Sequence, residues 1–115
     1  MCSISFIGIG LMGMPMAKNI LKKNKLTVFN RTIEKAKILS KDGAIIAKSI
    51  KDAVTNADVV ITMLSDDDAV LSILNSQEFT DNIKSYSTVI DMSSIKPKTA
   101  IKIHNFLKEK KINFL

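Results

Sequence analysis

Three glycines near the start of the chain, at positions 8, 10 and 13, constrain its fold more than any other feature. They lie in the run Phe6-Ile7-Gly8-Ile9-Gly10-Leu11-Met12-Gly13, which predicts a strand, a tight turn and the start of a helix. Gly8 allows the turn, Gly10 lacks the Cβ that would hold a pyrophosphate away from the backbone, and Gly13 lets the helix pack closely on the strand. The N–H groups of the first helical turn would then face phosphates, so the run predicts a dinucleotide site. Flexible loops also produce this spacing, so its meaning depends on the rest of the chain.

Strand and helix patterns alternate along the rest of the chain. The expected strands are residues 4–9, 26–30, 44–47, 59–64 and 88–92, with another beginning at 112. The expected helices are residues 14–23, 33–41, 49–54, a segment that follows Ser65, and 97–110. Such alternation is typical of an α/β fold with a mainly parallel sheet. With the glycine run it predicts one Rossmann-type, doubly wound domain over residues 1–115.

Several helix ends have recognisable capping residues. Gly43 supplies the C′ position after the second expected helix, and Ser49 with Asp52 resembles a capping box. Ser65 is expected to cap the next helix, whose first turn then holds three aspartates at 66–68. Consecutive helical residues point about 100° apart, so these aspartates suit the positive end of a helix dipole better than a metal site.

The composition limits the compartment and the partners. The only cysteine, Cys2, excludes an internal disulfide and suits a reducing interior, so we expect a cytoplasmic protein. The first residues lack a basic segment, and glycines and Pro15 interrupt the apolar stretch after them, which argues against a signal peptide and against a membrane segment. Basic residues exceed acidic ones by 17 to 11. Because the lysines are dispersed without interleaved aromatic residues, we expect no nucleic-acid partner, and instead a basic surface that attracts a phosphorylated cofactor.

The end of the second expected strand carries the residues that select the cofactor. A dinucleotide site usually has an acidic residue here to bind the ribose hydroxyls, whereas this chain has Asn30, 22 positions after Gly8. A neutral amide does not repel a 2′-phosphate, and Arg31 offers a planar, charge-assisted contact to phosphate. With the hydroxyl of Thr32, these residues favour NADP, and NAD stays the alternative cofactor. The competing interpretation is an ordinary turn, with Thr32 as a helix cap and Arg31 exposed.

Four segments, at 6–20, 28–32, 61–64 and 91–97, form a longer pattern that covers nearly the whole chain. The first extends the glycine run with Met14-Pro15-Met16-Ala17. The last, Asp91-Met92-Ser93-Ser94-Ile95-Lys96-Pro97, follows the pattern D-x-S-[ST]-x-x-P. By these motifs the chain resembles the β-hydroxyacid dehydrogenase family, which includes 3-hydroxyisobutyrate dehydrogenases and tartronate semialdehyde reductases.

The resemblance implies roles for residues on two sides of the cofactor. The backbone around Leu11 and Met12 would bind pyrophosphate. The strand end at Met63 and Leu64 would contact the ribose and the nicotinamide.

Two serines are the candidate contacts for the substrate. By the resemblance, Ser94 would lie where cofactor and substrate meet, with Ser93 beside it. Both follow an expected strand and precede a helix, at the edge where α/β sheets bind ligands. Capping of that helix is an equally good account of Ser93.

The resemblance implies hydride transfer between NADP(H) and a small 3-hydroxy acid or semialdehyde, as the activity of a parent enzyme. Family members continue with a D-A-P-V-S-G-G-like substrate loop and a helical domain that holds a catalytic lysine. No lysine of this chain matches that residue by motif, and neither His104 nor Cys2 has neighbours that would support catalysis. We therefore expect no catalytic and no metal-binding residue, and a C-terminally truncated domain that binds cofactor without turning over substrate.

Two alternatives to this function stay open. Imine reductases share the motifs of the first domain and differ mainly in the part that is missing here. A non-catalytic module that senses NADP(H) is the second alternative. Because a missing domain would leave apolar surface uncovered, we also expect the chain to self-associate.

Overall fold

The computed structural model describes residues 2–8, 13–30, 33–64, 66–93 and 95–115, apart from the side chains of Ile33 and Lys35. Within these ranges, six parallel strands form one sheet in the order β3-β2-β1-β4-β5-β6. The strands are β1 (Ser3–Ile7), β2 (Lys25–Phe29), β3 (Ile45–Ile46), β4 (Val59–Thr62), β5 (Thr88–Asp91) and β6 (Asn113–Phe114). The chain winds outward from β1 in both directions, which confirms the predicted Rossmann-type, doubly wound fold.

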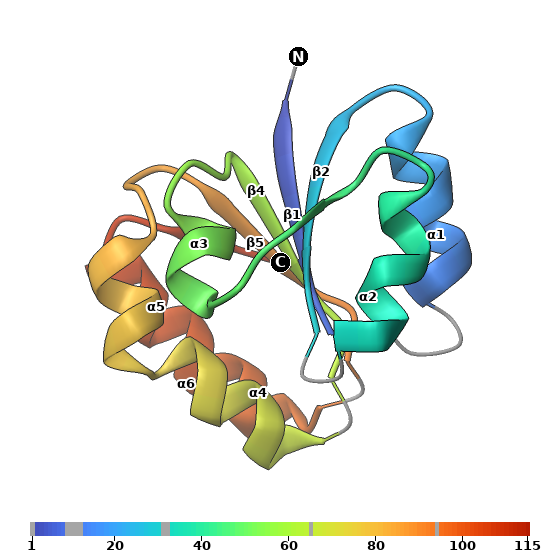
Figure 1. Cartoon of the computed structure of the whole chain (residues 1–115). Coiled ribbons are helices and arrows are strands. Elements are labelled where there is room, and N and C mark those ends of the chain that lie inside the picture. Colours follow the sequence, from blue (N-terminus) through green and yellow to red (C-terminus); the bar gives the residue numbers. More distant parts are fainter. Residues whose placement is uncertain (1, 9–12, 31–32, 65, 94) are drawn as a thin grey trace.

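Helices cover both faces of the sheet (Figure 1). On one face lie α1 (Gly13–Leu21) and α2 (Ile33–Ser40); on the other lie α3 (Ile50–Val54), α4 (Asp67–Leu74), α5 (Gln77–Asn82) and α6 (Pro97–Glu109). Each face has its own hydrophobic cluster. Neighbouring residues of β1 enter different clusters, because Phe6 packs with Ala17 of α1 while Ile7 faces the opposite side. Apolar residues on both faces of a strand are what a parallel sheet between two helix layers requires.

The expected elements form within two residues of their predicted bounds, but the sequence does not predict α5. This helix begins where the Ser76 hydroxyl accepts a hydrogen bond from the Phe79 N–H at 3.2 Å. The Phe79 ring is fully buried. A helix of six residues with one buried side chain shows no hydrophobic period, so the pattern does not reveal it.

The start of α4 corrects one predicted cap. The cap is not the expected Ser65, which lies outside the described residues, because the helix begins at Asp67 and Asp66 is its N-cap. Asp66 has an extended backbone, with φ of −160°, and its Oδ1 accepts from the Ala69 N–H at 2.8 Å. Serine and aspartate cap helices about equally well, so two adjacent candidates cannot be separated by residue type.

Two other predicted helix ends are confirmed. The Ser49 hydroxyl accepts from the Asp52 N–H at 3.1 Å and caps α3. Gly43 follows α2 with φ of +99°, the left-handed conformation expected at a C′ glycine.

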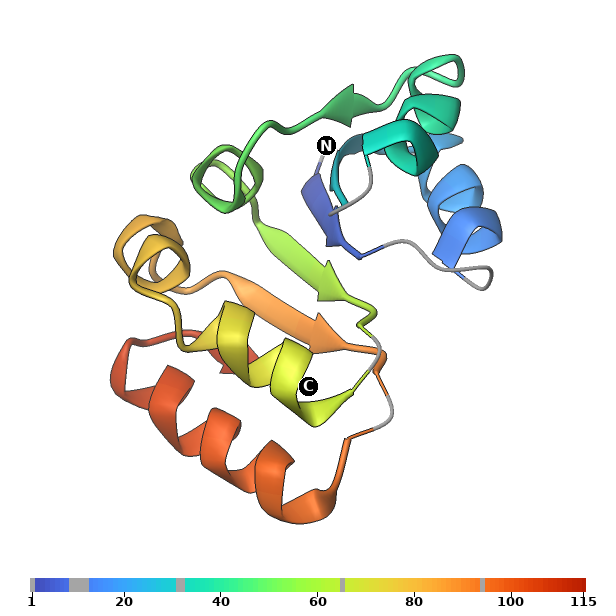
Figure 2. The ribbon, with the colours of Figure 1, turned by 60° about the horizontal axis from the view of Figure 1, so that its bottom comes forward.

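On the side of α1 and α2, no described helix covers the part of the sheet formed by β5 and β6, which we call the bare face (Figure 2). Figure 2 shows these helices beside β1 and β2, with no described helix against β5 on that side. Ile90 of β5 packs with the cluster under α1 and α2. Leu115 pairs beside Ile90, since its N–H donates to the Val89 carbonyl at 2.9 Å and its carbonyl accepts from the Asp91 N–H at 3.1 Å. Met92 is 47% exposed and Leu115 is 75% exposed, so this end of β5 and β6 presents apolar side chains to solvent.

Candidate cofactor site

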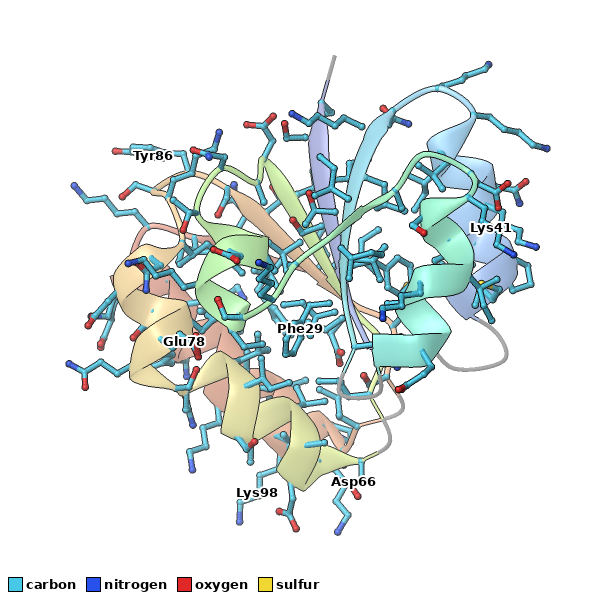
Figure 3. All side chains as sticks on the ribbon, in the orientation of Figure 1. Phe29, Lys41, Asp66, Glu78, Tyr86 and Lys98 are labelled. Carbon is cyan, nitrogen blue, oxygen red and sulfur yellow. The ribbon has the colours of Figure 1, made fainter. Side chains whose placement is uncertain are left out.

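The carboxyl ends of the central strands meet at one edge of the sheet. There the Gly8 N–H donates to the Phe29 carbonyl at 2.9 Å, and the Met63 N–H donates to the Ile7 carbonyl at 3.0 Å. The residue after β1 is thus joined to the end of β2, and the residue after β4 to the end of β1. The Phe29 ring packs against the cluster on the α3 side (Figure 3). Open α/β sheets bind ligands at this edge, where the strand order reverses between β1 and β4.

Gly8 is a position where the backbone requires glycine. Its φ is +85°, a conformation that residues with a Cβ rarely adopt. A Cβ on Gly8 would lie 2.4 Å from the Met63 carbonyl oxygen and 2.7 Å from the Leu64 Cδ2. Position 8 therefore combines the predicted turn with a close approach of β1 to the end of β4, and it brings three predicted cofactor residues together.

Gly13 is also close to this edge, but with more room. It is buried at the start of α1. A Cβ here would lie 3.4 Å from Cε1 of Phe6 and 3.5 Å from Sδ of Met63, which are ordinary contact distances. The helix packs closely on the strand, as the sequence predicts, yet the space would also accept alanine.

Ser93 lies between the ends of β4 and β5. Its hydroxyl accepts a hydrogen bond from the Leu64 N–H at 2.7 Å. It does not cap α6, whose N-cap is Lys96 without a side-chain cap bond. The hydroxyl therefore joins the two segments that the sequence assigns to nicotinamide and substrate, and its proton remains able to be donated.

The sequence interpretation did not predict a hydrogen-bonded pair of polar side chains, Thr62 and Asp91, next to Ser93. Thr62, which is fully buried, donates its hydroxyl proton to Oδ1 of Asp91 at 2.7 Å. The same oxygen accepts from the Ser93 N–H at 3.2 Å. A polar residue at the end of each of two adjacent apolar strands is the sequence feature that could have indicated this pair.

A second aspartate holds the start of α6. Oδ2 of Asp67, in the first turn of α4, accepts from the Thr99 hydroxyl at 2.6 Å and from the Lys96 N–H at 3.1 Å. These bonds, the Thr99 bond first, hold the pKa of Asp67 below its usual range. Asp66 and Lys98 mark the starts of α4 and α6 at the same end of the molecule (Figure 3). Of the three aspartates expected at a helix start, one caps its own helix and one binds the neighbouring helix.

Several predicted site residues lie outside the part of the chain that the structure describes. They are Gly10, Leu11, Met12, Arg31, Thr32 and Ser94. Asn30 is described, and it directly follows Phe29, whose carbonyl binds Gly8. The described predictions, Gly8, Gly13, Asn30, Met63, Leu64 and Ser93, all lie at this one edge of the sheet.

Within the same described ranges, no three His, Cys, Asp or Glu side chains gather as ligands of a metal ion would. Nor does any helix among the described residues have the length and apolarity needed to cross a membrane.

Curated proteins of related sequence include named oxidoreductases. The chain is 38% identical to the NAD-dependent L-serine dehydrogenase of Pseudomonas aeruginosa over an alignment of 117 positions. This alignment covers 100% of the chain and 39% of that protein. It is 37% identical to the 3-sulfolactaldehyde reductase of Escherichia coli over 99 residues, which is 84% of the chain and 33% of the relative. The chain thus spans between a third and two fifths of the length of these relatives.

Solved structures and a family model agree with this relationship. The Mycobacterium tuberculosis 3-hydroxyisobutyrate dehydrogenase, solved with L-serine, superposes with a TM-score of 0.92 at 27% identity, over 99% of this chain and 39% of that one. An imine reductase of Myxococcus stipitatus in complex with NADP+ gives 0.91 at 27% identity, over 97% and 39%. The model of the NAD binding domain of 6-phosphogluconate dehydrogenase matches residues 3–115. These matches confirm the resemblance to β-hydroxyacid dehydrogenases, and the chain belongs to the family of NAD binding domains typified by that of 6-phosphogluconate dehydrogenase.

Proposed function

We propose that this domain binds NADP(H) and positions it for hydride transfer to or from a small 3-hydroxy acid or semialdehyde. The observation that carries the proposal is the contact of Gly8 with Met63 and Leu64 at the sheet edge, beside the turn that belongs to the family's NAD binding domain. Relatives named for 3-sulfolactaldehyde and for L-serine support a small, polar substrate. The nicotinamide supplies the hydride, and the protein supplies binding, orientation and electrostatics.

The described residues at the sheet edge then have separate roles in holding the cofactor. The absence of a Cβ at Gly8 lets Met63 and Leu64 approach the turn closely, and these two residues would contact the ribose and the nicotinamide of the bound cofactor. Ser93 holds the backbone of Leu64 and keeps a proton to donate. We assign no proton-transfer residue within the 115 residues, and we propose that they bind cofactor without turning over substrate.

The preference for NADP rests on the turn after β2. Asn30 is neutral, so it does not repel a 2′-phosphate, and Arg31 next to it in sequence is a planar phosphate ligand. The net charge of +6 also favours the more anionic cofactor. Relatives differ in cofactor, since one is named NAD-dependent and a solved neighbour holds NADP+, so the preference of this chain is inferred from its own residues 30–32.

Fluorescence titration with NADPH and NADH tests the cofactor preference. Arg31→Ala should weaken NADPH binding by about 1.5–3 kcal/mol, the scale of a charge-assisted hydrogen bond, and leave NADH binding nearly unchanged. Lys37→Ala, which removes the same charge from an exposed position of α2, serves as the control and should change neither. Equal affinity of the unmodified chain for both cofactors, or tighter binding of NADH, would overturn the assignment of Asn30 and Arg31.

Imine reduction is the second candidate function. It is supported by the Myxococcus stipitatus imine reductase, of which 39% superposes on this chain with a TM-score of 0.91. Both candidates use the same cofactor edge, so a panel of small semialdehydes and cyclic imines separates them. A non-catalytic NADP(H)-binding module would act on neither group of substrates.

We also propose that the bare face at Met92 and Leu115 mediates self-association. Both side chains are exposed and apolar, at 47% and 75%. A second molecule would shield them from water. Light scattering should show a mass that rises with protein concentration, and a strictly monomeric species at high concentration would refute the proposal.

A further inference from the structure

One carboxylate oxygen joins the strand ends that carry the proposed nicotinamide contacts. Asp91 ends β5 and pairs in register with Thr62, which ends β4. Oδ1 of Asp91 accepts both the Thr62 hydroxyl, at 2.7 Å, and the Ser93 N–H, at 3.2 Å. Thr62 is fully buried and Asp91 is half-buried, so the first of these bonds is partly shielded from solvent. This oxygen therefore fixes the segment after β5 against the end of β4.

Two further hydrogen bonds join the end of β4 to the segment that follows β5. The Met92 N–H donates to the Thr62 carbonyl at 2.7 Å, and the Ser93 hydroxyl accepts from the Leu64 N–H at 2.7 Å. Asp91 thus fixes the backbone of Ser93, and Ser93 fixes the backbone of Leu64. The position of the proposed nicotinamide contact at Leu64 depends on this chain of bonds.

The second oxygen of the same carboxylate differs from the first in its surroundings. Oδ2 of Asp91 is buried and has no hydrogen-bond partner within the described ranges. A buried, unpaired oxygen destabilises a folded protein, and an ionised one does so more strongly. The two donors to Oδ1 therefore fix the orientation of the Asp91 side chain, and in this orientation Oδ2 meets no donor of the described residues. An aspartate here is better explained by the geometry that it enforces than by the stability that it adds.

We propose that Asp91 is a positioning residue for the nicotinamide end of the cofactor site, acting through Ser93 and Leu64 without touching the cofactor. The inference rests on the proposed function. It requires an acceptor at Oδ1 rather than a negative charge, because both donors meet that one oxygen. Asp91→Asn keeps such an acceptor, whereas Asp91→Ala removes it.

The test compares two ligands of the 115-residue chain: NADPH, and 2′-phospho-ADP-ribose, which lacks the nicotinamide. In Asp91→Ala the Kd of NADPH should rise about tenfold, the loss of about one hydrogen bond, while the Kd of the fragment stays within about twofold. A role in stability alone would weaken both ligands together. Asp91→Asn should keep both Kd values within about twofold of the unmodified chain and unfold at an equal or higher temperature.

A matched control removes a carboxylate from the opposite edge of the sheet, at the start of the neighbouring strand β4. Asp58 immediately precedes β4, accepts from the Ser3 N–H at 3.0 Å and pairs with Lys84. Asp58→Ala should leave both Kd values unchanged. If it shifts the Kd of NADPH as Asp91→Ala does, the effect is not specific to the nicotinamide side and the inference fails.

Three further results would overturn the inference: equal weakening of both ligands by Asp91→Ala, no weakening of either, and a loss of NADPH affinity in Asp91→Asn as large as in Asp91→Ala. If Asp91→Ala does not fold, Thr62→Val removes one donor and keeps the branched side chain. It should raise the Kd of NADPH alone, and an unchanged Kd would count against the inference. Failure of the unmodified chain to bind either ligand would instead contradict the proposed function, so the two failures are distinguishable.

Discussion

Replacement of Gly8 by alanine tests the geometry on which the cofactor edge depends. Two separate penalties apply at this position. The backbone has φ of +85°, and the new Cβ would lie 2.4 Å from the Met63 carbonyl oxygen and 2.7 Å from the Leu64 Cδ2. Because one of these neighbours is backbone, the end of β4 itself has to move.

The expected destabilisation follows from both penalties. A left-handed backbone costs a residue with a Cβ about 1–2 kcal/mol. Overpacking of a closely packed contact costs about 1–3 kcal/mol more. The free energy of unfolding should therefore fall by about 2–5 kcal/mol, and at about 4 °C per kcal/mol the melting temperature should fall by about 8–20 °C.

Gly43→Ala is the matched control for the backbone penalty. Gly43 has φ of +99°, but a Cβ there meets nothing within 4 Å. Only the backbone penalty applies, so Tm should fall by about 4–8 °C. Thermal unfolding followed by circular dichroism measures both variants, and the difference between them isolates the contact of Gly8 with Met63 and Leu64. Equal melting temperatures of the two variants would refute the close approach of β1 to β4.

Three further predictions concern the same edge. Gly13→Ala should raise stability by about 0.5–1 kcal/mol through helix propensity. It should leave the Kd of NADPH within about twofold, because the new Cβ meets only ordinary contacts. A loss of NADPH binding would show that the cofactor needs this space. Hydrogen bonds hold the pKa of Asp67 below its usual value, so its ionised form contributes stability above about pH 4 and this contribution is lost as the pH falls through the lowered pKa. Asp67→Asn should therefore make Tm less sensitive to acid below about pH 4, and identical pH profiles of Tm would contradict this. Ser93→Ala leaves the Leu64 N–H without its acceptor. In urea titrations the free energy of unfolding should fall by about 0.5–1.5 kcal/mol at an unchanged m-value. An unchanged free energy of unfolding would mean that water replaces the bond.

The features that were predictable from sequence are those encoded by neighbouring residues. The turn at Gly8 and the apolar strand at β4 are local, and with the alternation of strands and helices they predict the doubly wound fold that the structure confirms. The cap at Ser49 is equally local, since its partner Asp52 lies three residues away.

The features that could not be predicted depend on contacts between distant segments. The bond from Thr62 to Asp91 joins residues 29 positions apart, and it exists only because β4 and β5 pair in one particular register. Asp67 binds Thr99, 32 residues away, because α4 and α6 start side by side. A sequence pattern shows the residue types at these positions, but not the register or the helix packing that brings them together.

The division of the core by the sheet has a consequence for local unfolding. Except for Ile61, the buried members of the cluster under α1 and α2 come from residues up to 44, and except for Ile7, those of the other cluster come from residue 47 onward. We therefore expect the chain to unfold as two successive cooperative units that share the boundary between β1 and β4. In hydrogen exchange we expect the amides of this boundary to be protected longest, while either helix layer opens separately. Cofactor binding across the boundary should couple the two units and slow the exchange of both.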